Sequence, residues 1–196
     1  MKRLSVILLI AVGSCLATGG FATDATPEFP VVQEFYWDDG SVDGYVNDPD
    51  GHYWGVEFGP ELTGGSPGTV SQVGAVTSSW PDSTFQGCYL HIFSEYNGQP
   101  YEDLSRDYLQ GTPGVSYDWV GTDVYVSTGT FYLVYESYGN FPSCDSLGYD
   151  TDNSGHSYGG DGWQPLGYEL MLRCYWESAG IDTAATTWGG IKTLYR

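Results

Sequence analysis

The sequence contains few basic residues. Lysine and arginine together number 6 among 196 residues, against 25 aspartates and glutamates, and the formal net charge is −19. Proteins that bind nucleic acid need many cationic side chains to displace the counterions of the phosphates. The composition therefore excludes DNA or RNA as a partner.

Basic residues are scarcest inside the chain. Only Arg106 and Arg173 lie within the span from Asp24 to Asp182, which holds all of the acids. Repulsion among so many anions lowers stability unless salt or bound cations offset it. Structural divalent cations are one interpretation of this imbalance, and the solvated acidic surface of an extracellular protein is the other.

Long apolar runs are missing, apart from residues 4–12. This run is too short to span a bilayer and follows the positive Lys2 and Arg3, which predicts a secretory signal peptide over residues 1–22. Residues 12–15 also resemble a lipoprotein box, and cleavage there would leave Cys15 for a lipid anchor. We expect a secreted or cell-surface bacterial protein without a transmembrane span.

Cysteine is also rare. Once Cys15 is cleaved off or lipidated, Cys88, Cys144 and Cys174 remain, so at most one disulfide forms among them. Cys88 and Cys174 fall in expected strands, and Cys144 falls in a turn-rich segment. A disulfide from Cys144 to either partner is our expectation for an oxidising compartment, and the spacing does not choose between them.

Motifs of the common enzyme classes are missing from the sequence. There is no Gly-x-Ser-x-Gly elbow, no His-Glu-x-x-His helix and no phosphate-binding glycine loop with its lysine. A carboxylate pair for glycoside hydrolysis is available in so acidic a chain, but abundance alone makes it unspecific. We predict a protein that is not an enzyme.

Aromatic residues and glycine are what the sequence has in abundance. Aromatic side chains make up 16% of the residues, and 28 glycines and 10 prolines supply turns. Runs rich in β-branched and aromatic residues, each bounded by turn residues, predict an all-β, antiparallel two-sheet sandwich of jelly-roll type. The domain covers residues 23–177, and residues 178–196 form a linker and a short tail. The expected strands, about eight in number, are residues 31–37, 53–58, 70–77, 86–93, 116–120, 124–127, 130–138 and 168–177.

Alternation within the expected strands assigns side chains to faces. Cys88, Leu90 and Ile92 share one face and leave His91 on the other. A shorter strand is expected around residues 157–158. Residues 101–109 are expected to form at most two helical turns.

A pattern resembling a calcium loop begins at Asp150. Oxygen-bearing side chains stand at its first, third and fifth places, and Gly155 stands at the sixth. The flanking sequence is not that of an EF-hand, and any β-turn uses the same residue types. A second acidic cluster, residues 38–44, directly follows the first expected strand. The candidate calcium ligands are Asp150, Asp152, Ser154, His156 and Asp161, together with Asp38 and Asp39.

Exposed aromatic rings are the second candidate feature, because they stack on sugar rings. Most large aromatics of a sandwich fill its core. Trp163 stands in a glycine-rich loop with Tyr158 just before it, and Trp54 follows an acidic turn. We expect these three residues to contact a ligand.

The chain resembles a β-sandwich module of secreted and surface proteins of bacteria, which often carry a C-terminal sorting segment. The resemblance covers roughly residues 33–177, and it implies an accessory or adhesive role without naming a ligand or catalytic residues. The segments that carry it are residues 35–44, 88–93, 129–134, 147–158, 162–163 and 168–173.

Taken together, the sequence predicts a calcium-stabilised, non-catalytic module that recognises a polysaccharide or another surface protein. Two alternatives stand beside it. One is a small extracellular glycoside hydrolase, and the other is a structural subunit of an envelope or filament.

Overall fold

Antiparallel strands make up almost all of the computed structural model, which describes residues 32–46, 53–79, 87–110, 112, 116–137, 145–151, 155–160 and 162–179. Within these residues the only helix is the single turn α1, Pro60–Thr63. Sheets pack against one another, and every paired strand is antiparallel. The predicted all-β antiparallel sandwich is confirmed. The predicted signal peptide lies outside the described residues, as does the tail beyond Ala179.

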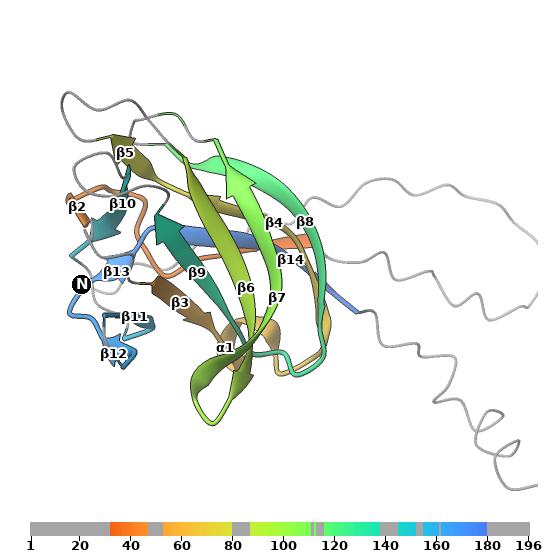
Figure 1. The fold of residues 1–196 in the computed structure, drawn as a ribbon. Coiled ribbons are helices and arrows are strands. Elements are labelled where there is room, and N and C mark those ends of the chain that lie inside the picture. Colours follow the sequence, from red (N-terminus) through yellow and green to blue (C-terminus); the bar gives the residue numbers. More distant parts are fainter. Residues whose placement is uncertain are drawn as a thin grey trace, which may run out of the picture.

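Two large sheets form the layers of the sandwich (Figure 1). The six-stranded sheet has the order β12 (Gln164–Pro165), β11 (Ser157–Gly159), β3 (Trp54–Phe58), β9 (Phe131–Ser137), β6 (Cys88–Tyr96), β7 (Gln99–Leu109). The four-stranded sheet has the order β1 (Val32–Phe35), β14 (Leu172–Ser178), β4 (Gly68–Ala75), β8 (Asp118–Val126).

A small third sheet lies at one end of the sandwich, at the left in Figure 1. Its order is β13 (Glu169–Leu170), β10 (Asp145–Asp150), β2 (Gly44–Val46), and β5 (Thr77–Ser79) also pairs with β10. The described residues therefore contain more strands than the sequence predicted, because several of them are only two or three residues long.

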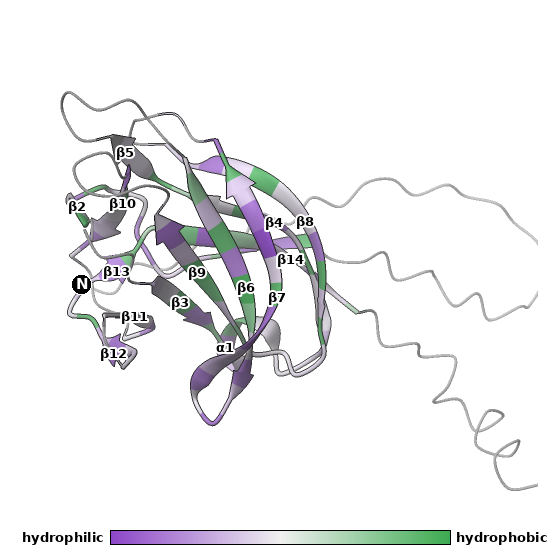
Figure 2. Cartoon of the chain, viewed as in Figure 1, coloured by the Kyte–Doolittle hydropathy of each residue, from purple (hydrophilic) through white to green (hydrophobic). Residues whose placement is uncertain are grey.

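The core lies between the two large sheets and follows the alternation of the strands. Leu90 and Ile92 of β6, Leu133 of β9 and Trp176 of β14 are all buried in it. Hydrophobic and hydrophilic residues alternate along β8 in Figure 2, which is the pattern of a strand with one face on the core. His91 lies on the opposite face from Leu90 and Ile92, as predicted.

The hairpin of β6 and β7 is the largest departure from the expected elements. Residues 101–109 belong to β7, so the expected helical turn there is wrong. Asn97 and Gly98 connect the strands, with φ of 55° and 72°. Positive φ at both positions is the geometry of a type I′ hairpin turn, for which Asn-Gly is the strongest short-range sequence signal. The sequence did not predict this strand because β7 has polar residues on both faces and therefore lacks apolar alternation.

The first and last strands of the sandwich are neighbours. Residues 32–35 of β1 pair with residues 174–177 of β14, and β14 pairs on its other side with β4. β14 ends at Ser178, one residue beyond the predicted domain boundary. None of the described helices has the length and apolar character required to cross a membrane.

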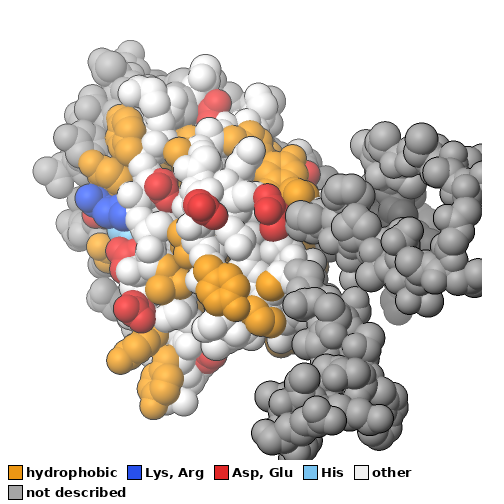
Figure 3. All heavy atoms as spheres, turned by 90° about the vertical axis from the view of Figure 1, so that its right-hand side faces the viewer, with side chains coloured by type: hydrophobic (Ala, Val, Ile, Leu, Met, Phe, Trp, Pro, Cys, Tyr) orange, Lys and Arg blue, Asp and Glu red, His pale blue; other side chains and the backbone are white. Residues whose placement is uncertain are grey.

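Acidic side chains are spread over the surface. Figure 3 shows several of them among hydrophobic and neutral side chains, while blue basic atoms are visible at one place, the left edge of that view. The two basic residues of the described chain, Arg106 and Arg173, each contact carboxylates. They are therefore already neutralised by the protein itself.

Candidate binding site

The outer face of the six-stranded sheet, which points away from the core, brings several aromatic and charged side chains together; we call it the aromatic face. The strand register aligns these side chains in three rows across the sheet. The first row is Tyr158, Gly55, Val134, His91 and Arg106, the second is Glu57, Tyr132, Phe93 and Asp103, and the third is Glu136, Tyr89 and Tyr108.

His91 stands at the centre of a charged cluster on this face. Its Nδ1 lies 2.9 Å from Oδ2 of Asp103 on β7, and its Nε2 lies 2.8 Å from Oε2 of Glu136 on β9. Both ring nitrogens of His91 are therefore next to carboxylate oxygens. The ring is 3% exposed, so these bonds join three neighbouring strands in a nearly dry environment.

Arg106 completes the cluster from β7. Its Nε and Nη2 donate to Oε2 of Glu136 at 3.0 and 2.9 Å, and its Cζ lies 3.5 Å from the ring centroid of Tyr89. Burial alone would raise the pKa of Glu136, but the hydrogen bonds from His91 and Arg106 outweigh it and lower that pKa. Glu136 therefore stays ionised.

Aromatic rings surround the charged cluster. Tyr53 meets the ring of His91 edge-on at 5.9 Å between centroids, and Phe93 stacks on it at 5.7 Å. Tyr53 and Tyr108 remain 46% and 40% exposed. The face therefore presents partly exposed aromatic rings beside charged and hydrogen-bonding groups.

Trp163 and Tyr158, two of the three predicted ligand-contacting residues, lie together at one end of the aromatic face. Their rings stack at 5.9 Å with an interplanar angle of 6°, and the Tyr158 hydroxyl donates to Oε2 of Glu57 at 3.2 Å. Burial and then the charge of Glu57 raise the pKa of Tyr158. Both side chains are partly exposed.

Trp54 requires a correction. Its ring is buried in the core, where it stacks on Tyr135 at 6.4 Å, so it is not the exposed ring that the sequence predicted. The alternation of β3 explains this position, because Trp54 shares the inward face with Val56 and Phe58. The exposed ring is that of the preceding residue, Tyr53.

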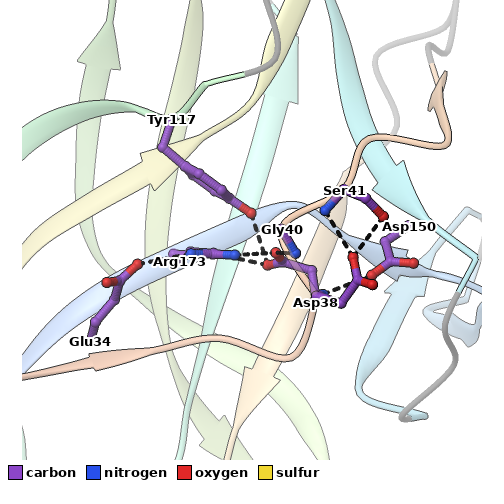
Figure 4. Close-up of polar contacts among 8 residues, drawn as sticks. Glu34, Asp38, Gly40, Ser41, Tyr117, Asp150 and Arg173 are labelled. Atoms are coloured by element: carbon purple, nitrogen blue, oxygen red, sulfur yellow. Dashed lines mark hydrogen bonds and ion pairs between the residues drawn. The ribbon is translucent and has the colours of Figure 1, made fainter. Parts of the chain in front are cut away.

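Asp38, a predicted calcium ligand, is instead bound by Arg173 (Figure 4). Nε of Arg173 donates to Oδ2 of Asp38 at 3.1 Å and Nη2 donates to Oδ1, while Nη1 reaches Glu34 at 3.1 Å. The Tyr117 hydroxyl also donates to Oδ2 of Asp38, at 2.8 Å. Burial by itself would lower the pKa of Arg173, but these bonds raise it overall. Asp38 thereby connects Arg173 with Tyr117.

The two predicted acidic segments do come together. The backbone N–H of Asp39 donates to Oδ2 of Asp150 at 2.8 Å, and that of Thr151 donates to Oδ2 of Asp43 at 3.0 Å. Figure 4 shows Asp150 beside the turn formed by residues 38–41. The sequence did not predict this contact, since 111 positions separate Asp39 from Asp150.

Among the described residues, no three His, Cys, Asp or Glu side chains are arranged to hold a metal ion. His156 stacks flat on Trp37, with 3.9 Å between ring centroids. Asp152, Ser154 and Asp161 lie outside the described residues. Asp39 and Asp150 are the predicted ligands that the structure places side by side.

The described cysteines are both buried in the core as free thiols. Burial raises the pKa of Cys88 and of Cys174 well above that of an ordinary thiol. Their predicted partner, Cys144, lies outside the described residues.

Two carboxylates of the aromatic face, those of Asp103 and Glu136, are both bonded to His91, whose ring lies between them.

No known protein family matches the chain, and a search of curated proteins finds no match either. The site must therefore be interpreted from its own geometry.

Proposed function

We propose that this chain is a secreted or cell-surface recognition module, without catalytic activity, that binds a polysaccharide through the aromatic face. The observation that carries the proposal is the arrangement of Tyr53, Phe93 and Tyr89 around the charged cluster of His91 on one face of a rigid sheet. Sites built on strands hold their side chains more precisely than sites on loops. The resemblance to modules of bacterial surface proteins supports the same reading.

The charges of the aromatic face and of the whole chain indicate which class of polysaccharide would bind. Arg106, the arginine of the face, is already bonded to Glu136, and His91 is bonded to Glu136 and Asp103. The net charge of −19 would repel an anionic glycan. A neutral polysaccharide is therefore the proposed ligand, in preference to an acidic or sulfated one.

Affinity electrophoresis through gels that contain soluble neutral polysaccharides tests this proposal. We expect at least one of them to retard the wild-type chain, and Tyr53→Ala to weaken the retardation roughly tenfold, because a stacking ring contributes on the order of 1 kcal/mol beyond its buried area. Tyr125→Ala is the matched control, since Tyr125 is an exposed tyrosine of β8 on the other sheet. Equal losses in both variants, or no retardation in any gel, would contradict the proposal.

We also propose that calcium stabilises the loops next to β10. The contact between Asp39 and Asp150 supports this, because it brings two acidic segments to one place where a cation would offset their repulsion.

A structural subunit is the second candidate, and β7 favours it. This strand has 11 residues at the edge of its sheet, and among the described strands it pairs only with β6. Such an edge can add a strand from another chain. Glu102, Asp103 and Asp107 along it oppose that pairing, which is why we prefer recognition. Sedimentation analysis would detect the assembly that this candidate requires.

A further inference from the structure

Four side chains pack against one another where β11 and β12 meet the aromatic face. The ring of Tyr132 lies 5.6 Å from that of Trp163 and 6.1 Å from that of Tyr158, both nearly perpendicular to it. Tyr158 stacks on Trp163 and donates its hydroxyl to Glu57. The four residues therefore form one cluster, which we call the Trp163 cluster.

A notch in the sheet receives the indole. Gly55 stands between Tyr158 and Val134 in the first row and has no side chain to fill its place. A Cβ added at Gly55 would lie only 2.7 Å from Cη2 of Trp163, so the indole rests directly on the backbone. The indole of Trp163 occupies the space that a side chain at position 55 would take.

The backbone of Trp163 is held in an unfavourable conformation. Its φ is 54°, in the left-handed region, which a bulky residue other than glycine rarely adopts. Strained residues of this kind gather at ligand clamps and switches, because only the surrounding structure keeps them in place. The short loop between β11 and β12 thus holds the indole against Gly55, although the backbone of Trp163 is strained there.

Two polar groups of the cluster are buried without a partner. Tyr132 is fully buried, and its hydroxyl faces Glu57 but makes no hydrogen bond of normal geometry. Nε1 of Trp163 is buried and likewise has no hydrogen-bond partner. Native proteins pair nearly all such groups, so two orphans in one cluster need an explanation.

We propose that the Trp163 cluster is a subsite for one neutral sugar unit and that the indole of Trp163 is its cover. This inference rests on the proposed polysaccharide recognition and states which atoms of the cluster contact one sugar unit. When the indole leaves Gly55, the Tyr132 hydroxyl donates to a sugar hydroxyl, and a second sugar hydroxyl donates to the carboxylate of Glu57. The released indole then stacks on the sugar ring, and its Nε1 reaches solvent or a sugar oxygen.

The neutral charge of the sugar follows from the same residues. Glu57 is the charged member of the cluster, and its charge contributes to the raised pKa of Tyr132, after burial. A uronate or sulfate placed against Glu57 would meet like charge in a buried environment. A sugar hydroxyl, which both donates and accepts, satisfies the two orphan groups without adding charge.

Two tyrosines of β9 provide a matched pair for the test. Both Tyr132 and Tyr135 are fully buried, but the Tyr135 hydroxyl donates to the carbonyl oxygen of Asp145 at 2.8 Å. Tyr135→Phe removes a satisfied bond and should lower the melting temperature by several degrees. Tyr132→Phe removes an orphan hydroxyl, so its melting temperature should stay the same or rise. This pair shows that the Tyr132 variant is folded.

The binding experiment uses the full chain labelled with 5-fluorotryptophan. Fluorine NMR follows the resonance of Trp163, assigned by its loss in Trp163→Phe. The probes are glucose, galactose, mannose, xylose and N-acetylglucosamine in the millimolar range, with glucuronate as the charged comparison. We expect at least one neutral sugar to shift the Trp163 resonance saturably and Tyr132→Phe to weaken that binding about tenfold, which corresponds to one lost hydrogen bond.

Three results would overturn the subsite: no shift with any neutral sugar, an equal shift in wild type and Tyr132→Phe, or a stronger shift with glucuronate. These failures are distinct from failure of the proposed function. If the gels retard the wild type and Tyr53→Ala abolishes retardation while Tyr132→Phe leaves it unchanged, the aromatic face binds polysaccharide without the Trp163 cluster. If no gel retards the wild type, the broader proposal fails as well.

Discussion

Arg173 donates hydrogen bonds to both carboxylate oxygens of Asp38, a residue that is 2% exposed and 135 positions away in the sequence. The guanidinium also lies over the rings of Tyr36 and Tyr117, at 4.4 and 4.3 Å from their centroids. The pair joins β14 to the segment that follows β1. In a chain with so few cations, this one is used to neutralise a buried acid.

We predict that Arg173→Met lowers the free energy of unfolding by about 3 to 5 kcal/mol, because it leaves the buried carboxylate of Asp38 without its cation. Urea denaturation measures the change. Arg106→Met is the control: its side chain is 47% exposed, and its loss should lower stability much less. Similar losses of unfolding free energy in the two variants would show that burial of the Arg173–Asp38 pair does not increase its contribution to stability.

The lowered pKa of Glu136 makes part of the stability depend on pH. The folded chain holds this pKa below the value of an unfolded glutamate, about 4.3. The contribution of Glu136 is therefore complete above that value and is lost as the pH falls through the folded pKa. His91 and Arg106 are the neighbours whose hydrogen bonds lower this pKa.

We predict that Glu136→Gln is less stable than the wild type by about 1 to 2 kcal/mol at neutral pH and that the difference narrows below about pH 4. Unfolding in urea at a series of pH values gives both curves. A difference that stays constant across the series would show that the ionisation of Glu136 contributes nothing.

Ser157 connects a buried carboxylate to the backbone. Its hydroxyl donates to Oε2 of Glu169 at 2.7 Å and accepts from the N–H of Leu170 at 2.9 Å, and Glu169 is fully buried. We predict that Ser157→Ala lowers the free energy of unfolding by about 1 to 3 kcal/mol, since two buried polar groups lose a partner. Thr128→Ala removes an exposed hydroxyl bonded to the Thr130 carbonyl and should change stability little. Thermal unfolding of both variants compares them directly.

Calcium is expected to raise the melting temperature relative to a chelator. Asp150→Asn should remove much of this increase, because it takes one charge from the place where the acidic segments meet. The amide oxygen of asparagine can still accept the hydrogen bond from the Asp39 N–H. A lower melting temperature of this variant in calcium would therefore reflect weaker metal binding and not the loss of that hydrogen bond. Identical melting curves with calcium and with chelator would reject a calcium role.

Local pattern was enough to predict the fold class but not the site. Alternation in residues 88–92 identified a strand of the core and put His91 on its other face, because the period of a strand is a local property. It could not identify Asp103 and Glu136 as partners of His91, since they lie 12 and 45 positions away on two other strands. Such pairs depend on strand order and register.

The missed strand β7 and the misplaced Trp54 have different causes. β7 carries polar residues on both faces, as an edge strand does, and so lacked the apolar period that identified the others. Trp54 was expected to be exposed because it follows an acidic turn, but it begins β3 and shares the inward face with Val56 and Phe58. The Asn97-Gly98 turn was the one signal in the sequence that could have located β7.

Pairing of the first described strand with the last has a consequence for how this chain folds. β1 cannot join its sheet until β14 has been synthesised, because among the described strands β14 is the partner that connects it to the rest of that sheet. Closing so long a loop is entropically costly and makes folding slow. A growing polypeptide would therefore remain incompletely assembled until β14 is complete, and it would depend until then on protection from premature association.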